Sequence, residues 1–260
     1  MPKNDLFFTK PLLNVAGFLG YYPNSHNQPV IDDLNAWGGL GALVTDPISY
    51  LPRKTLENSQ FLPTEGGYLL HNGLPNPGFW GVVKTAAKRW DYSALPIIPH
   101  LLAEEVERTV KMVRTLEPAE NILAVELNIP FNKPDQPPAW LEALPALQVE
   151  IPIIVSLPPQ FVELYGERFL KKGASAISLR APRGRAFLPK EEGDEQKQGG
   201  MVSGRLYGGE LFSQSCDVIH RARRAGWPII AGVGFDTLEK VEWALGEGAL
   251  AVALDLRCWC

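Results

Sequence analysis

Residues 228–254, PIIAGVGFDTLEKVEWALGEGALAVAL, hold two short apolar runs separated by a segment long enough for a helix. The runs at 228–231 and 249–254 are rich in Ile, Ala, Val and Leu, which is typical of parallel strands buried on both faces. Residues 237–246 are predicted to form the helix between them, and Gly248 suits the turn that follows a helix. This stretch therefore predicts one β-α-β unit with the usual right-handed crossover.

The same alternation continues through the rest of the chain. Six further apolar runs are separated by segments long enough for a helix and its loops, so the chain has eight candidate strands. Eight such units predict an α/β fold, a single TIM-type (β/α)8 barrel spanning residues 1–260. An open doubly wound sheet has the same alternation and is not excluded by the count alone. The other six strands are predicted at 12–16, 42–45, 96–100, 123–128, 153–157 and 176–179.

The connecting helices are also visible in the pattern. Residues 103–115, AEEVERTVKMVRT, place Val106, Val110 and Val113 at helical spacing, with charges on the other side. Further helices are predicted at 161–172 and 211–225, and Gly173 repeats the glycine seen after the last helix.

Two segments break the alternation. Residues 50–78 are rich in Pro, Gly and Asn and predict turns or a small hairpin over one end of the barrel. Residues 189–200, PKEEGDEQKQGG, are charged and nearly free of apolar side chains, which predicts a mobile loop. Both excursions lie where the loops of a barrel surround its active-site mouth. The second is either a lid or an ordinary surface loop.

The composition limits the classes of partner. The chain has 260 residues, 45% of them hydrophobic, and its 25 Lys and Arg against 29 Asp and Glu give a net charge of -4. A chain without a basic excess offers no broad field for nucleic acid or anionic lipid, so a small molecule or another protein is the expected partner.

The cysteines and the chain ends predict a cytoplasmic protein. Cys216, Cys258 and Cys260 are too few for a disulfide framework, and the four histidines are scattered, so no metal site is predicted. The N-terminus lacks the pattern of a signal peptide, and no apolar stretch approaches the length of a membrane span.

Several motifs, in order along nearly the whole chain, resemble those of the dihydroorotate dehydrogenase family. They are LGALVT at 40–45, GLPNPG at 73–78, VELNI at 125–129, PIIV at 152–155, GRLYG at 204–208 and IIAGVG at 229–234. The resemblance implies an eight-stranded barrel that holds FMN at the carboxyl ends of its strands. It also implies the oxidation of dihydroorotate to orotate, in which a cysteine or serine base removes a proton while hydride passes to the flavin.

The chain departs from this family at three chemical positions. Where the family has Ser-Cys-Pro-Asn, this chain has Pro130, Phe131 and Asn132, so no base is present and no catalytic residue is assigned. Asp46 stands where the family has a lysine that touches flavin and substrate, and a carboxylate there would repel an anionic orotate. Ser156 replaces a second lysine that stabilises negative charge on the flavin. We therefore predict that efficient dihydroorotate oxidation is absent.

The binding positions of the family are better preserved. Small residues let a flavin approach the backbone, and glycine amides can cradle a phosphate. An ordinary turn glycine, or an Asn that satisfies a loop, explains the same residues equally well. By resemblance, the cofactor-binding positions are Ala16, Gly17, Asn128, Ser156, Gly208, Gly232 and Gly234, and the substrate-binding positions are Gly73, Leu74 and Asn132.

The C-terminal end of the barrel leaves FMN binding open. After the last predicted strand the chain has Asp255, which would oppose a phosphate, and it ends before the closing helix of the family. An exposed barrel wall would invite a homodimer or a partner subunit. Three hypotheses follow: a divergent FMN oxidoreductase, a non-catalytic binding or regulatory subunit, and a barrel that binds a phosphate ligand without flavin.

Overall fold

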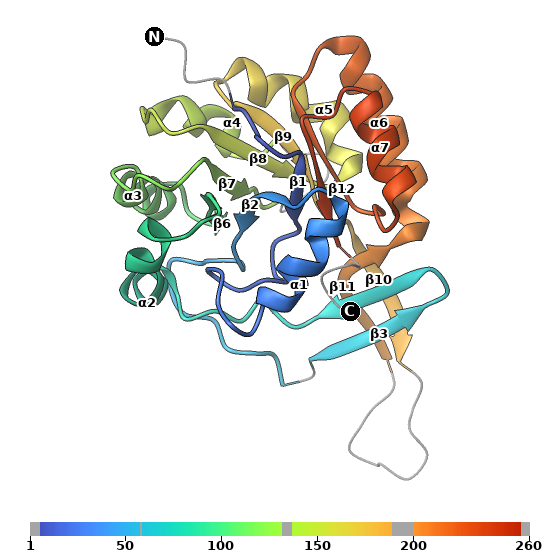
Figure 1. Ribbon diagram of the computed structural model, residues 1–260, viewed down its shortest axis with the longest axis horizontal. Helices are drawn as coiled ribbons and strands as arrows, with labels where there is room; N and C mark the ends of the chain where they lie inside the picture. The colour runs from blue at the N-terminus through green and yellow to red at the C-terminus, as the bar shows by residue number, and fades with distance from the viewer. Residues whose placement is uncertain (1–5, 58, 132–136, 189–199, 256–260) are drawn as a thin grey trace.

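The computed structural model describes residues 6–57, 59–131, 137–188 and 200–255. Its centre is a parallel sheet in the order β5-β2-β1-β13-β12-β9-β8-β7-β6. β5 (Ile97–Ile98) and β6 (His100–Leu102) at the two ends are pieces of one strand interrupted at Pro99. The nine pieces therefore form eight parallel positions around a closed barrel, which confirms the predicted fold (Figure 1).

Each of the eight predicted runs forms a barrel strand. Parallel pairing continues around the barrel, for example from Leu13 to Ala253 and from Glu126 to Ile154. The remaining strands are β1 (Leu12–Asn14), β2 (Leu40–Val44), β7 (Val125–Asn128), β8 (Ile153–Leu157), β9 (Ala176–Leu179), β12 (Ile229–Gly232) and β13 (Ala251–Leu254).

Side chains alternate between the inside of the barrel and its outer wall, because successive residues of a strand point to opposite faces. The inside is filled by small or branched apolar side chains, among them Ala42, Ile98, Ile154, Ala176 and Ala251. The outward-facing residues of the same strands pack against the helices in a larger core. Among the described residues, polar side chains line the inside of the barrel towards the carboxyl ends of its strands, and this places the site there.

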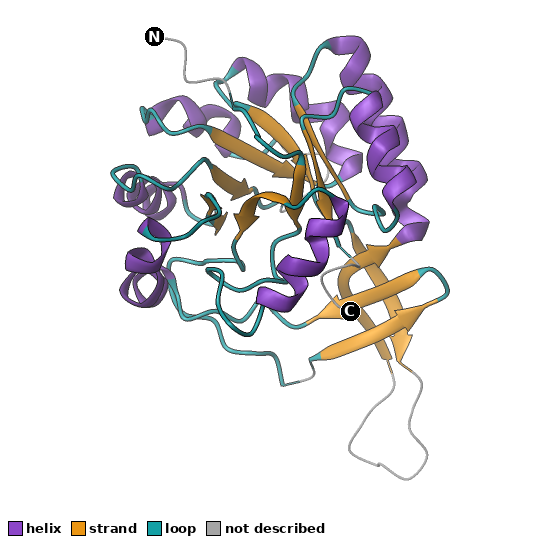
Figure 2. Ribbon diagram, in the orientation of Figure 1, coloured by secondary structure: helices purple, strands orange, loops and turns teal. Residues whose placement is uncertain are grey.

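The helices surround the strands, as Figure 2 shows in purple. The helices predicted at 103–115, 161–172, 211–225 and 237–246 are confirmed, with ends shifted by up to three residues. The helices are α1 (Gln28–Asp33), α2 (Phe79–Asp91), α3 (Val106–Leu116), α4 (Trp140–Ala143), α5 (Pro159–Lys171), α6 (Phe212–Ala225) and α7 (Leu238–Gly246). Short 3-10 helices occupy 34–37, 144–147 and 209–211. None of these helices has the length and apolar character needed to cross a lipid bilayer.

A second, antiparallel sheet lies at one end of the barrel, at the lower right of Figures 1 and 2. Its order is β10 (Arg183–Leu188), β11 (Gly200–Gly208), β4 (Gly67–His71) and β3 (Gln60–Thr64). The excursion at 50–78 thus contributes a hairpin, which pairs with the strand that follows the second excursion. Of the predicted loop at 189–200, residues 189–199 lie outside the described residues, and Gly200 begins β11.

Candidate functional site

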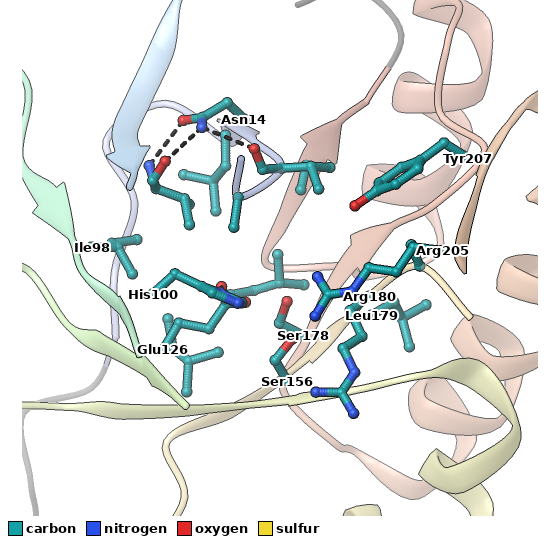
Figure 3. A pocket seen from close by; sticks show the side chains of 18 residues that line it. Asn14, Ile98, His100, Glu126, Ser156, Ser178, Leu179, Arg180, Arg205 and Tyr207 are labelled. Carbon is teal, nitrogen blue, oxygen red and sulfur yellow. Dashed lines mark hydrogen bonds and ion pairs between the residues drawn. The ribbon is translucent and has the colours of Figure 1, made fainter. Parts of the chain in front are cut away.

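A small cavity lies inside the barrel at the carboxyl ends of its strands. Its volume is about 30 Å³, and its lining comes from strands on all sides of the barrel and from β11. Polar or charged side chains that line it include Asn14, His100, Glu126, Ser156, Ser178, Arg180, Arg205 and Tyr207 (Figure 3). One water molecule needs about 10 to 15 Å³ of such space, so the cavity has room for about two.

The antiparallel sheet covers this cavity at the mouth of the barrel. Tyr68 of β4 and Tyr207 of β11 are both buried, and their rings stack with centroids 5.1 Å apart. Phe18 packs edge-on against Tyr207, with ring centroids 5.5 Å apart. These aromatic contacts anchor the sheet over the mouth, because stacked rings bury large apolar areas with a defined geometry.

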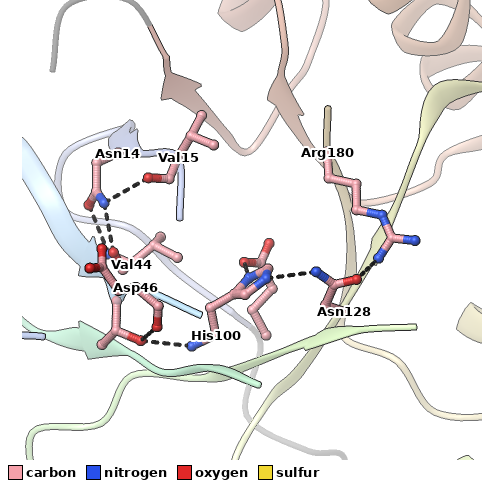
Figure 4. A network of polar contacts seen from close by, with 9 residues as sticks. Asn14, Val15, Val44, Asp46, His100, Asn128 and Arg180 are labelled. Carbon is pink, nitrogen blue, oxygen red and sulfur yellow. Dashed lines mark hydrogen bonds and ion pairs between the residues drawn. The ribbon is translucent and has the colours of Figure 1, made fainter. Parts of the chain in front are cut away.

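A row of four hydrogen-bonded side chains crosses the mouth (Figure 4). The carboxylate of Glu126 contacts Nδ1 of His100, and Nε2 of His100 lies 3.0 Å from Nδ2 of Asn128. Oδ1 of Asn128 then accepts from Arg180, which also donates a 2.8 Å hydrogen bond to the carbonyl of Ile129. Glu126, His100 and Asn128 are all at least nine-tenths buried.

The arginine fixes the direction of every hydrogen bond in this row. A guanidinium has only donors, so Asn128 must turn its Oδ1 towards Arg180 and its NH2 group towards His100. Nε2 of His100 must then accept, which leaves the proton of the neutral ring on Nδ1, facing Glu126. The donors and acceptors therefore define one tautomer of His100 and one orientation of the Asn128 amide.

Glu126 is ionised in this arrangement. Burial acts to raise its pKa, but the neighbouring His100, the Ser178 hydroxyl and Arg180 stabilise the charge and hold the pKa below its ordinary value. A buried carboxylate with several donors is stabilised in this way because each hydrogen bond favours the charged form.

Asp46 follows β2 at the same end of the barrel. Its Oδ1 accepts a 3.1 Å hydrogen bond from the backbone amide of Gly20, so the side chain ties the loop after β1 to β2. Burial raises the pKa of Asp46, although the hydrogen bond from the amide of Gly20 opposes the change. Burial and Asp46 in turn raise the pKa of Tyr21.

Positive charge gathers on the opposite side of the mouth. Burial lowers the pKa of Arg180 to about 9, and the nearby Arg205 and Arg183 act in the same direction, with Glu126 opposing them. Within the described residues, the guanidinium of Arg205 makes no hydrogen bond or ion pair. Figure 3 shows Arg205 reaching into the cavity towards Ser178.

Of the predicted cofactor positions, Ala16, Asn128 and Ser156 meet at the mouth. Ala16 and Ser156 line the cavity, and Asn128 contacts two of its lining residues. The Ser156 hydroxyl is buried and has no hydrogen-bond partner among the described residues. Gly17 follows Ala16 with a φ of 102°, a conformation that favours glycine.

The predicted phosphate glycines are closely packed against backbone. A Cβ atom on Gly232 would lie 2.3 Å from the carbonyl oxygen of Leu179, and one on Gly208 would lie 2.2 Å from that of Gly66. The amide of Gly234 donates a 3.2 Å hydrogen bond to the carboxylate of Asp255. Close strand packing is thus sufficient to explain the glycines at 208 and 232.

Two of the predicted substrate positions, Gly73 and Leu74, do not line the cavity. Gly73 and Leu74 both have positive φ, 75° and 57°, in the turn after the β3–β4 hairpin. There the carbonyl of Gly73 accepts from Arg53, and the amide of Leu74 donates to Asn72. Asn132 lies outside the described residues.

Sequence reasoning assigned no role to His100 and did not single out Glu126, Arg180 or Arg205. A signal for Glu126 was present, because it interrupts an apolar strand in phase with the inward-facing Ala124. The arginines carry no such signal, since their meeting depends on how β9 and β11 fold over the mouth.

No family model matches the chain. It is similar to the putative dihydroorotate dehydrogenase A (fumarate) of Aeropyrum pernix, with 32% identity over 120 residues, which are 46% of this chain and 37% of that protein. It is 25% identical to the catalytic subunit of dihydroorotate dehydrogenase B (NAD(+)) of Shouchella clausii, over 94% of this chain and 82% of that protein. The matched part covers 52% of the dihydroorotate dehydrogenase (fumarate) of Trypanosoma cruzi, at 29% identity and over 60% of this chain. The match therefore spans well under two thirds of two of these three relatives.

Solved structures agree on the fold. The dihydroorotate dehydrogenase of Eimeria tenella in complex with ferulenol superposes with a TM-score of 0.64 over 94% of this chain and 75% of that one, at 12% identity. The ligand-free structure of the same enzyme gives a TM-score of 0.58 over 94% of this chain and 78% of that one, at 13% identity.

Proposed function

We propose that this divergent relative of the dihydroorotate dehydrogenases binds a small ligand at the barrel mouth without flavin and without oxidising dihydroorotate. The observation that carries this proposal is the hydrogen bond from the Gly234 amide to the Asp255 carboxylate. A phosphate at the family's phosphate turn would need that amide, and it would meet a carboxylate in its place.

Two properties of the mouth argue against the binding of FMN in this conformation. The first is the carboxylate of Asp255, which is fully buried beside the amide that a phosphate would use. The second is size, because sites for cofactors and drug-sized ligands are clefts of about 300 to 1,000 Å³, whereas this cavity measures about 30 Å³. The residues present therefore do not fit this cofactor, although the unpartnered Ser156 hydroxyl suits some polar ligand.

The side chains at the family's chemical positions support the loss of dihydroorotate oxidation. Asp46, in place of a lysine, is engaged with the Gly20 amide. Ser156, in place of the second lysine, offers a hydroxyl but no charge for a reduced flavin. The segment that would carry the base has no Cys or Ser in its sequence up to Asn132.

The visible spectrum of gently purified protein, followed by titration with FMN, tests the proposal. We expect no flavin absorption, no fluorescence change at micromolar FMN and no dihydroorotate-dependent reduction of an artificial electron acceptor. Bound flavin would overturn the proposal and favour the hypothesis of a divergent FMN oxidoreductase. The Asp255→Asn variant sharpens the experiment, because it removes the opposing charge and is the variant expected to gain any weak FMN binding.

The proposed binding role does not determine the oligomeric state of the protein. Association with a second copy or with another subunit stays a prediction, which size-exclusion chromatography with light scattering tests directly. A cytoplasmic location likewise stays a prediction from the sequence.

A further inference from the structure

The cavity at the mouth is lined by donors that lack acceptors. The hydroxyl of Ser156 is buried and unpartnered among the described residues, and the guanidinium of Arg205 makes no hydrogen bond or ion pair with them. A buried polar group such as the Ser156 hydroxyl is normally hydrogen-bonded, to protein, to water or to a ligand. Arg205 is only partly buried and lines the same cavity. The two groups lie on opposite walls, Ser156 on β8 of the barrel and Arg205 on β11 of the covering sheet.

The charges around the cavity favour an anion. Arg180 directly follows β9 and Arg205 belongs to β11, and both line the cavity. Neither forms an ion pair with a carboxylate in the described residues. Arg180 donates to the amide oxygen of Asn128 and to the backbone carbonyl of Ile129, and neither of these neutral acceptors compensates its charge. Glu126 is the nearest ionised carboxylate, and its acceptors face His100 and Ser178.

The second carboxyl at the mouth does not cancel this charge. Asp46 does not line the cavity, and its Oδ1 is engaged with the amide of Gly20. Burial depresses the pKa of Arg180, and the nearby Arg205 and Arg183 act in the same direction. A negative charge in the cavity would stabilise Arg180 and Arg205 together.

The size of the cavity limits the anion. Space for about two water molecules suffices for one small anionic group and excludes an aromatic ring system. Tyr207 is buried, and Figure 3 shows its hydroxyl directed into the same space from the side of Arg205. The available donors thus surround a volume that matches a single oxyanion.

We propose that the mouth cavity binds one small oxyanion, either inorganic phosphate or sulfate or the single anionic group of a small molecule, through Arg205, Ser156 and Tyr207. This inference rests on the proposed function, because it names the ligand class of the same flavin-free site. The row from Glu126 to Arg180 has a positioning role in it: it holds the second cation beside the cavity in a fixed orientation.

Isothermal titration calorimetry of the purified, dialysed protein tests this proposal, with sodium phosphate, sodium sulfate and sodium acetate as separate titrants at constant ionic strength. We expect saturable binding of at least one of the three at one site per chain. Phosphate or sulfate would identify a tetrahedral ligand, and acetate alone would identify the carboxylate of a small molecule. No saturable binding of any of them up to about 10 mM would overturn the proposal.

Variants locate the site. Arg205→Gln should weaken binding at least about tenfold, because a charge-assisted hydrogen bond is lost, and Arg205→Lys should restore part of it. Arg221→Gln is the control, since Arg221 is an exposed arginine of α6 that pairs with Glu163 and does not line the cavity. Equal affinities of the wild type and Arg205→Gln would place any binding elsewhere and overturn the proposal. Circular dichroism of each variant establishes that it is folded.

The two proposals fail in different ways. A flavin-free protein that binds none of the three anions contradicts the oxyanion site and leaves the proposed function intact. Flavin absorption in the same preparation contradicts the proposed function, independently of the result of the anion titrations.

Discussion

Nε2 of His100 lies 3.0 Å from the Nδ2 atom of Asn128, so the ring nitrogen must accept a hydrogen bond from the amide. The neutral ring then carries its proton on Nδ1, against Glu126. We expect the 15N spectrum of labelled protein at neutral pH to show this tautomer, with Nδ1 protonated and Nε2 bare. His100→Gln assigns the signals by their loss.

The Asn128→Asp variant should change the state of the same ring. A carboxylate at this position accepts a proton from Nε2 and leaves His100 between two negative charges, so both nitrogens should become protonated. A wild-type ring that carries its proton on Nε2, or a variant spectrum identical to that of the wild type, would contradict the hydrogen-bond directions given above.

Asp46→Asn should stabilise the protein at neutral pH. Burial raises the pKa of Asp46 in the folded state, so the folded protein binds a proton that the unfolded chain has released, and stability falls as pH rises through this range. An asparagine keeps the acceptor for the Gly20 amide without the charge. The gain in the free energy of unfolding should disappear below about pH 4, where the carboxyl is protonated in both states.

Urea unfolding of both proteins between pH 4 and pH 8 measures this difference. The exposed Asp33→Asn variant controls for the change in net charge. A loss of stability in Asp46→Asn across the whole range would show that the charge of Asp46 is needed in the folded state.

Gly232→Ala should destabilise the barrel by about 1 to 3 kcal/mol, because the added Cβ would lie 2.3 Å from the carbonyl oxygen of Leu179 and must force the strands apart. Gly246→Ala at the end of α7 is the control, since a Cβ there meets no atom within 4 Å. We expect that variant to be neutral or up to about 1 kcal/mol more stable. Thermal and urea unfolding compare the two, and equal effects would remove the packing explanation for Gly232.

Ser156→Ala and Ser215→Ala should have opposite effects on the unliganded protein. Ser215 is fully buried, and its Oγ lies 2.9 Å from the carbonyl oxygen of Gly232 and 2.8 Å from that of Val233. Loss of this hydroxyl should therefore lower the free energy of unfolding by about 1 to 2 kcal/mol. Ser156 has no partner among the described residues, so its replacement should be neutral or stabilising by up to about 1 kcal/mol.

The same pair of variants separates stability from binding. Ser156→Ala should lower the affinity of the protein for the anion, whereas Ser215→Ala should leave this affinity unchanged. If Ser156→Ala lowers the stability of the anion-free protein as much as Ser215→Ala does, then its hydroxyl already has a partner and is not a free donor for a ligand.

The barrel could be predicted from the chain because its evidence is local. Each strand is a short apolar run, each helix has its own periodicity, and glycines such as Gly173 and Gly248 mark the turns between them. The order of these units then leaves few topologies open, since parallel strands require right-handed crossovers. The family's motifs added Asn128 and Ser156 as positions of interest, and both lie at the mouth.

Only the tertiary structure decided what those positions do. Arg205 lines the same cavity as Ser156 because a strand from beyond the second excursion folds over the barrel, and no spacing along the chain encodes that arrangement. Asp255 reaches the Gly234 amide because β13 lies beside β12, which turns a glycine-rich phosphate motif into a packed and occupied turn. Contacts between residues far apart in sequence depend on where whole elements pack, and that packing is a property of the complete fold.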